Sequence, residues 1–390
     1  MTNKNITNIA TTLKSVLPKS KDFIALHEPK FDGNEWKYLK DCLDSTYVSS
    51  VGEYVKRFEL SLKKVTGLKH VVAVVNGTAA LHICLKIVGV EKGDEVLMPT
   101  LTFVATANAV TYNGAIPNFV DSSNLTLGMD PEKLDDYLKD ISKMRGGMCF
   151  NKKTGRRIKA ILPVHTYGHS VDLDPLLSIC ERYKLELVED AAESLGSFYK
   201  GKHTGNWGKV AAMSFNGNKI VTTGGGGAIL TNDDKLGDLA RHLTTTAKLT
   251  HPWLFIHDEI GFNYRMPNIN AALGCAHLES LPKFIEKKRQ LYNLYKTAFQ
   301  NVKGLKVFTE PSFGKSNYWL NALLLDHDLS KERDSLLELL NNNGIMARPT
   351  WNLMHELQIY YDCPKMDDLS VAQNLTRCLI NIPSSPHLVV

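Results

Sequence analysis

Short apolar runs alternate with amphipathic stretches in the first half of the chain. Helix-like segments such as TAALHICLKIVG follow these runs, and one helix is predicted from Asp174 to Tyr183. This alternation is typical of a largely parallel sheet with helices on both faces. We therefore predict an α/β fold that binds ligands at the carboxyl ends of its strands. The apolar runs are VVAVV (71–75), EVLMP (95–99), PNFVD (117–121), AILPVH (160–165) and LELVED (185–190).

The pattern changes toward the C-terminus. A long helix rich in Lys and Arg is predicted from Leu281 to Phe299, and a strand-like NALLL, a helix around Lys331 to Asn342 and the run GIMARPTW follow it. We predict a large domain over residues 23–280 and a smaller C-terminal α+β domain over residues 281–390.

Residues 1–22 form a predicted N-terminal extension. Ile6, Ile9, Leu13 and Val16 recur at helical spacing, so a short amphipathic helix is expected to dock on the body or on a partner subunit. The segment lacks the apolar core of a secretory signal. No apolar run is long enough to span a membrane, so we expect no membrane role.

Composition narrows the class of protein. With 390 residues, 43% of them hydrophobic and 22% charged, the chain has an ordinary globular composition. The net charge of +5 is mild and no aromatic-interleaved basic stripe occurs, so nucleic-acid binding is not favoured. Seven scattered cysteines without a Cys-x-x-Cys pair argue against a disulfide framework or a metal site. A cytoplasmic location is expected.

The segment 143–159, KMRGGMCFNKKTGRRIK, is locally basic, with seven Lys and Arg residues around two turn signals. A solvated hairpin is the simpler interpretation. An electropositive flap near an anionic substrate is the alternative.

Lys219 lies in the segment SFNGNKIVTTGGGG, between a polar turn and four consecutive glycines. A solvated loop lysine is the more common case. The segment is not a Walker A loop, because its lysine precedes the glycines. Gly224 to Gly227 allow positive φ and close backbone approach. A lysine at a strand end beside such a loop is a candidate Schiff-base nucleophile.

Other strand ends carry candidate chemistry of their own. Gly77 and Thr78 begin a helix after the first strand, where backbone N–H groups can hold a phosphate or simply cap the helix, and Ser214 adds a hydroxyl. Asp190 ends LELVED, as a helix cap or as the partner of a protonated pyridine nitrogen. Phe103 can stack on a ring or belong to the core.

A phosphate site, a stacking aromatic, a carboxylate and a lysine are together the parts that hold pyridoxal phosphate. The set therefore predicts a pyridoxal phosphate site, with Lys219 as the Schiff-base lysine.

Five segments resemble the DegT/StrS sugar-nucleotide aminotransferases, in order from about residue 23 to the C-terminus. The resemblance implies the fold-type-I pyridoxal phosphate architecture, a homodimer, and amination of keto-sugars carried on nucleotide diphosphates. HEPKFDGNE, STYVSSVG and FNKKTGRR resemble more narrowly the legionaminic-acid and bacillosamine-type branch, which acts on a UDP-linked 4-keto-6-deoxy-N-acetylhexosamine. The five segments are VNGTAALH (75–82), PTLTFVATANAV (99–110), VEDAAESLGS (188–197), SFNGNKIVTTGGGG (214–227) and GFNYRMPNINAALG (261–274).

By this resemblance Lys219 holds the cofactor covalently and Asp190 pairs with its pyridine nitrogen. The phosphate contacts implied are Gly77, Thr78 and Ser214, with Phe103 stacked on the ring. Asn263 would reach the phosphate of the neighbouring subunit's cofactor. Glu193 stands where most members have glutamine, near the phenolic oxygen of the cofactor. The implied substrate-side residues are His165, Tyr264, Arg265, Arg348 and Trp351.

The resemblance implies transfer of an amino group from an amino acid, L-glutamate, to the C4 ketone of the sugar nucleotide, for bacterial surface-glycan biosynthesis. Lys219 is expected to move the proton between the donor's α-carbon and the cofactor. One alternative is a sugar-nucleotide dehydratase, in which this lysine is replaced, often by histidine. Another is a non-catalytic cofactor-binding regulator, which would need a DNA-binding segment that the sequence does not show.

Overall fold

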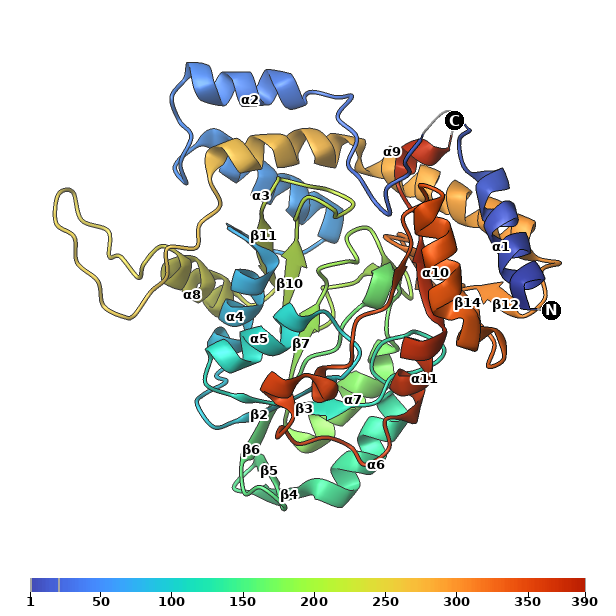
Figure 1. Cartoon of the computed structure of the whole chain (residues 1–390). Coiled ribbons are helices and arrows are strands. Elements are labelled where there is room, and N and C mark those ends of the chain that lie inside the picture. Colours follow the sequence, from blue (N-terminus) through green and yellow to red (C-terminus); the bar gives the residue numbers. More distant parts are fainter. Residues whose placement is uncertain (1, 20–21, 390) are drawn as a thin grey trace.

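A large sheet forms the centre of the computed structural model, which describes residues 2–19 and 22–389 (Figure 1). Its strands are His70–Val74 (β1), Glu95–Pro99 (β2), Ile116–Val120 (β3), Ser142–Arg145 (β4), Met148–Asn151 (β5), Arg157–Ile161 (β6), Glu186–Asp190 (β7), Val210–Ser214 (β10) and Gly227–Thr231 (β11). The main order is β1-β11-β10-β7-β6-β2-β3. Strand β11 is antiparallel to both neighbours, whereas β10, β7, β6, β2 and β3 are joined by parallel pairs. The predicted α/β fold is confirmed.

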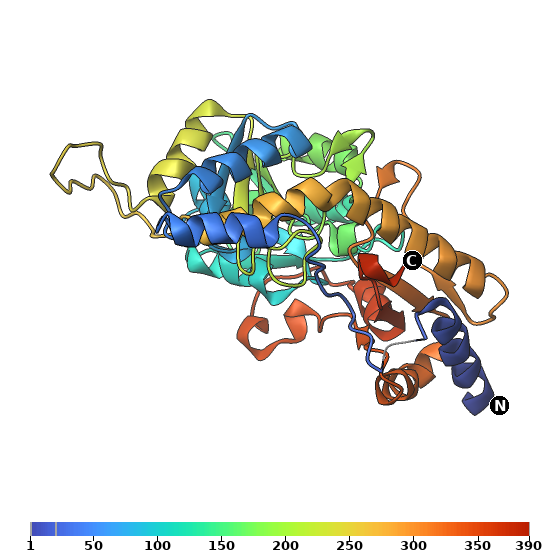
Figure 2. The same ribbon diagram turned by 90° about the horizontal axis from the view of Figure 1, so that it is seen from above.

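Helices cover both faces of this sheet (Figures 1 and 2). In β1, Val71 and Ala73 belong to the core cluster formed with α3 and α9, while Val72 and Val74 belong to the cluster formed with α4, α5 and α8. Because successive side chains point to opposite faces, a strand covered on both sides is apolar throughout. The helices are Glu35–Asp44 (α2), Glu53–Thr66 (α3), Gly77–Ile87 (α4), Val104–Tyr112 (α5), Pro131–Ile141 (α6), Leu173–Tyr183 (α7), Asp234–Thr244 (α8) and Asn268–Phe299 (α9).

Helix α9 links the large sheet to the C-terminal part of the chain. It begins at Asn268 rather than at Leu281, and it continues through Pro282. The boundary predicted between residues 280 and 281 therefore lies inside one helix. Beyond α9, a four-stranded sheet in the order β12-β14-β16-β15 packs with two more helices, each in its own core cluster. These elements are Leu305–Val307 (β12), Asn321–Leu325 (β14), Arg333–Asn342 (α10), Arg348–Pro349 (β15), Ser370–Cys378 (α11) and Leu379–Ile382 (β16).

A small three-stranded sheet joins the two parts of the chain. It pairs Phe198–Tyr199 (β8) with Lys202–His203 (β9) and with Gly314–Lys315 (β13). Short 3-10 turns occur at Thr166–Gly168 (η1), Leu329–Glu332 (η2), Met354–Glu356 (η3), Gln358–Tyr360 (η4) and Pro386–Leu388 (η5).

The predicted N-terminal helix is present as Thr2–Val16 (α1) and packs beside α9 and α10 (Figure 1). Ile6, Ile9 and Leu13 are buried in the core cluster of the C-terminal part. The extension therefore docks on the chain's own body. None of the helices in the described ranges is long and apolar enough to cross a membrane.

The basic segment 143–159 forms the β4–β5 hairpin, and β5 pairs with Arg157 and Ile158 at the start of β6. The ligand-binding edge of a parallel sheet lies at the other end of its strands. The hairpin is therefore distant from that edge within this chain, as expected for a solvated hairpin, and the flap interpretation loses its support.

An extended arm between α8 and α9, residues 248–260, projects from the body in both views (Figures 1 and 2). Its exposed side chains include Trp253 at 76%, Phe255 at 79% and Ile260 at 84% exposure. Large apolar side chains concentrated on a projecting segment are typical of an interaction site.

Candidate active site

A cavity of about 390 Å³ lies at the carboxyl ends of β1, β2, β7 and β10. It brings together residues that the sequence places far apart. The predicted residues that line it are Gly77, Thr78, Phe103, Asp190, Glu193, Ser214, Lys219 and Trp351.

Lys219 enters this cavity from a turn after β10. Its backbone N–H donates to the carbonyl of Asn216 at 3.0 Å, which closes the turn. Its Nζ lies 3.3 Å from Oε1 of Glu193 and 3.8 Å from the ring centroid of Trp319. The side chain is 13% exposed. Lys219 is thus an ordered amine at a cavity wall and not a solvated loop lysine.

Asp190 is a buried carboxylate at the end of β7. Its Oδ2 accepts from the Thr106 hydroxyl at 2.8 Å and its Oδ1 accepts from the Ala192 N–H at 3.1 Å. Burial raises the pKa of Asp190, and those two hydrogen bonds only partly oppose this effect. No cation among the described residues lies within 4.0 Å of it. A ligand that brings a positive charge to this carboxylate would therefore be favoured.

The start of α4 forms the opposite part of the cavity wall. The side chain of Asn76 caps the helix by accepting from the Ala79 N–H at 2.7 Å. The N–H groups of Gly77 and Thr78, in the first turn, have no acceptor within the helix. A Cβ atom at Gly77 would lie 2.8 Å from Cβ of Ser214, so a larger residue does not fit. This end suits an anion such as a phosphate.

Gly224 adopts the expected positive φ, at 76°, and Gly226 and Gly227 allow the expected close approach. They do not line the cavity. A Cβ atom at Gly227 would lie 2.4 Å from the carbonyl oxygen of Asn76, and one at Gly226 would lie 2.1 Å from Oγ1 of Thr223. At these two positions the chain's own backbone and side chains occupy the space that a Cβ atom would need.

Glu193 faces Lys219 from a buried position. Its Oε2 accepts from the Tyr167 N–H at 2.8 Å, and Tyr167 adopts a left-handed φ of 55°. Burial raises the pKa of Glu193, while the charge of Lys219 opposes the rise. Both of its oxygens face N–H groups, those of Tyr167 and Lys219, so the side chain is an acceptor in this arrangement.

Phe103 and Trp351 are aromatic residues of the cavity wall. Phe103 stands at the N-terminus of α5 and is 54% exposed, so it is not a core residue. Its ring centroid lies 6.4 Å from that of Trp351, which in turn lies 5.1 Å from that of Tyr167. The arrangement leaves the face of Phe103 available to a flat ligand.

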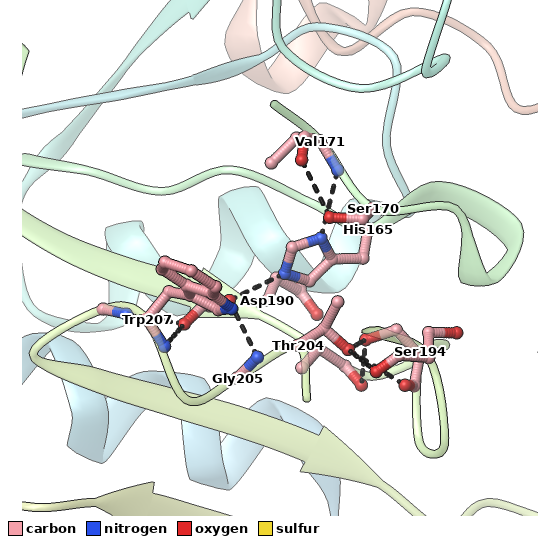
Figure 3. Close-up of polar contacts among 12 residues, drawn as sticks. His165, Ser170, Val171, Asp190, Ser194, Thr204, Gly205 and Trp207 are labelled. Carbon is pink, nitrogen blue, oxygen red and sulfur yellow. Dashed lines mark hydrogen bonds and ion pairs between the residues drawn. The ribbon is translucent and has the colours of Figure 1, made fainter. Parts of the chain in front are cut away.

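His165 does not line the cavity, because it belongs to a buried network behind it. Its Nδ1 accepts from the Val171 N–H at 3.4 Å, so Nε2 carries the proton that is donated to Glu189 at 2.9 Å. The same carboxylate accepts from the N–H groups of Gly205, Trp207 and Gly208, and Figure 3 labels His165, Gly205 and Trp207 of this network. Burial alone would raise the pKa of Glu189, but these donors outweigh it and the pKa is lowered. Both ring nitrogens of His165 are therefore used in hydrogen bonds within the chain, to Glu189 and from Val171.

Four further predicted residues also lie outside the cavity. Arg265 donates to Glu59 at 2.7 Å and to the carbonyl of Ala73 at 2.8 Å, so its guanidinium is already occupied. Tyr264 stacks on Phe262. Asn263 and Arg348 are exposed. The contacts of Arg265 within its own chain therefore do not support a role in substrate binding. Asn263 and Arg348 are exposed and could be reached by a second subunit.

Trp319 and Thr106 are site residues that the sequence did not indicate. Trp319 comes from the C-terminal part, and its Nε1 donates to the carbonyl of Asn218 at 2.7 Å. Nothing in SNYWLNALLL marks a tryptophan as part of a site 100 residues away. Thr106 could have been found, because it lies one helical turn after Phe103 in the strand-end segment.

Solved structures share this fold. The aminotransferase TlmJ from Streptoalloteichus hindustanus superposes with a TM-score of 0.83 at 25% identity over 93% of both chains. DesI, solved in the presence of its TDP-sugar product, gives 0.81 at 26% identity over 93% of this chain and 88% of its own. The chain therefore has the fold of the pyridoxal phosphate-dependent aminotransferases.

Sequence comparison identifies the family. The model of the DegT/DnrJ/EryC1/StrS aminotransferase family matches residues 29–389. GDP-perosamine synthase from Vibrio cholerae is 36% identical over 94% of this chain and 95% of its own length, and that from Escherichia coli O157:H7 is 37% identical over 94% of each. The chain belongs to this family, as the resemblance implied. It is a pyridoxal phosphate-dependent sugar aminotransferase.

The buried network of Glu189 gives a stability prediction. Glu189→Gln is expected to lower the free energy of unfolding by about 1–3 kcal/mol at neutral pH, because the amide replaces an acceptor oxygen by a donor and leaves buried backbone N–H groups without an acceptor. The folded-state pKa of Glu189 is below its ordinary value of 4.5. Its stabilisation is therefore fully present above that value and is lost as the pH falls through the folded-state pKa.

Urea unfolding of wild type and variant at neutral pH and at about pH 4 measures this difference. Glu186→Gln, on the same strand but partly exposed, is the matched control and should change little. A gap between wild type and Glu189→Gln that is equal at both pH values would contradict the assignment.

Proposed function

We propose that the enzyme transfers an amino group from L-glutamate to the C4 ketone of a nucleotide-linked 4-keto-6-deoxy sugar, foremost a UDP-linked N-acetylhexosamine, for surface-glycan biosynthesis. The observation that carries the proposal is the single cavity in which Lys219, Asp190 and the start of α4 meet. The names of the relatives support a nucleotide-sugar substrate. The UDP-linked sugar rests on the branch resemblance of HEPKFDGNE and STYVSSVG.

The cavity fits pyridoxal phosphate on three observations. The N–H groups of Gly77 and Thr78 with the Ser214 hydroxyl suit its phosphate, and a Cβ atom at position 77 would close that end. Asp190 is buried with no cation of the described residues within 4.0 Å, so it suits a protonated ring nitrogen. Phe103 has a free face for the ring. When bound, the cofactor draws off the electron pair that remains on a substrate carbon after its proton is removed.

In this proposal the chain's own residues position the reactants and move the protons. Lys219 holds the cofactor covalently and, once released, takes a proton from the donor's α-carbon and returns one on the sugar side. Asp190 stabilises the proton on the ring nitrogen, and the Thr106 hydroxyl fixes the orientation of its carboxylate. Glu193 lies 3.3 Å from the Lys219 amine, close enough to orient it between the two half-reactions.

Two chains would complete the site in a homodimer. The arm 248–260 exposes Trp253, Phe255 and Ile260, and Asn263 follows directly on it without reaching its own chain's cavity. Burial of such side chains stabilises subunit contacts. Asn263 of one subunit then contacts the cofactor phosphate of the other.

Amino transfer can be followed with ¹⁵N-labelled L-glutamate. The wild type is expected to place ¹⁵N on C4 of UDP-4-keto-6-deoxy-N-acetylhexosamine and to release 2-oxoglutarate, whereas Lys219→Ala should be slower by about 10²- to 10⁴-fold or more, the range for a lost general acid–base group. Lys209→Ala, which removes an exposed ion pair just before β10, is the matched control. Faster transfer to a GDP-linked 4-keto-6-deoxyhexose would contradict the proposed UDP-linked substrate. The absence of transfer to any sugar nucleotide would contradict the proposed amino transfer.

Shared sites can be tested by co-expressing two differently tagged variants. Lys219→Ala removes the lysine, and Asn263→Asp sets a carboxylate against the partner's phosphate site. Each variant alone is expected to be nearly inactive. The mixed dimer regains one intact site, so random pairing should restore about a quarter of the wild-type activity. Two tagged Lys219→Ala chains serve as the control, and a failure of the mixed pair to exceed them would refute site sharing.

A further inference from the structure

Lys288, on α9, is fully buried although it carries an amine. Its Nζ donates to three carbonyl oxygens, those of Ser384 at 2.5 Å, Trp319 at 3.0 Å and Tyr318 at 3.3 Å. Three acceptors match the three N–H groups of an ammonium. Burial lowers the pKa of Lys288, and no opposite charge among the described residues offsets that effect. A group this costly to bury calls for an explanation.

Two of the three bonds, those to Tyr318 and Trp319, go to an unusual turn, and the third ties it to the chain after β16. Tyr318 has a left-handed φ of 48° although it is not glycine. Side chains hold this turn on its other side, because the Ser316 hydroxyl accepts from the Tyr318 N–H and the Asn317 side chain accepts from the Trp319 N–H. Ser316 and Asn317 bind the N–H groups of the turn, whereas Lys288 binds the carbonyl oxygens of Tyr318 and Trp319. It therefore fixes the orientation of the peptide that carries Trp319.

Trp319 connects this turn directly to Lys219. Its indole N–H donates to the carbonyl of Asn218, the residue before the lysine, at 2.7 Å. Its ring lies 3.8 Å from the Lys219 amine. The same indole thus holds the backbone beside the lysine and the end of its side chain.

We propose that Lys288 is a positioning residue of the active site, which holds Trp319 so that the indole fixes the Lys219 loop and its amine. The proposal assumes the role of Lys219 given above. It adds a residue that does not line the cavity and acts through another side chain.

The test measures the reactivity of Lys219 itself, without substrate. Full-length protein freed of cofactor is acetylated with limiting acetic anhydride, and the modification of each lysine is measured by mass spectrometry. In Lys288→Met, Lys219 is expected to react about fivefold faster, the shift that corresponds to one lost hydrogen bond. The exposed Lys331 and the partly buried Lys133 serve as internal standards. Lys283→Met, an exposed site on the same helix, is the control variant and should leave all rates unchanged.

Unchanged Lys219 reactivity in folded Lys288→Met would overturn the proposal, as would an equal rise at Lys133, since that would indicate general loosening. If Lys288→Met does not fold, Trp319→Phe decides, because it removes the indole N–H and keeps a ring. Faster acetylation of Lys219 in Trp319→Phe then supports the proposal, and an unchanged acetylation rate overturns it. The measurement needs no sugar, so a failure of ¹⁵N transfer and a failure of this proposal are distinguishable.

Discussion

The close approach of three strand ends sets the geometry of the whole site. Gly227 in β11 lies against the carbonyl of Asn76, and Gly77 lies against Ser214 at the end of β10. These contacts leave no room for a Cβ atom, so they fix how far the start of α4 stands from the turn that carries Lys219. The strand register also brings the ends of β1 and β10 together, because Val74 and Ser214 both pair with Gly227. Without this packing the anion end and the amine would not belong to one cavity.

Buried charges are arranged in two different ways around that cavity. Glu189 accepts hydrogen bonds from several donors, including His165. These donors stabilise its ionised form, so its pKa is lowered. Asp190 and Glu193 have fewer donors and raised pKa values because burial dominates. Glu189 and Asp190, which are adjacent on β7, therefore have different roles. Glu189 supports the wall from behind, and Asp190 faces the cavity and is the carboxylate that gains most from a bound cation.

The fold and the centre of the site were predictable from sequence because both follow from local patterns. Apolar runs gave the strands, and parallel strands bring their carboxyl ends to one edge, which is why Thr78, Asp190 and Lys219 meet. The contacts that the sequence did not indicate are long-range. Glu59 occupies Arg265, Glu189 occupies His165, and neither partner lies near in sequence. Helix α9 begins at Asn268, thirteen residues before the predicted start at Leu281, and continues through Pro282. Trp319 reaches the site only through tertiary packing.

The central claim is that Lys219 is the residue to which the cofactor attaches. Borohydride reduction of the protein loaded with pyridoxal phosphate, followed by proteolysis and mass spectrometry, tests it most directly. The structure predicts one pyridoxyl group per chain, on the peptide that contains Lys219. Attachment to any other lysine, or a protein that binds the cofactor without a reducible adduct, would contradict the account.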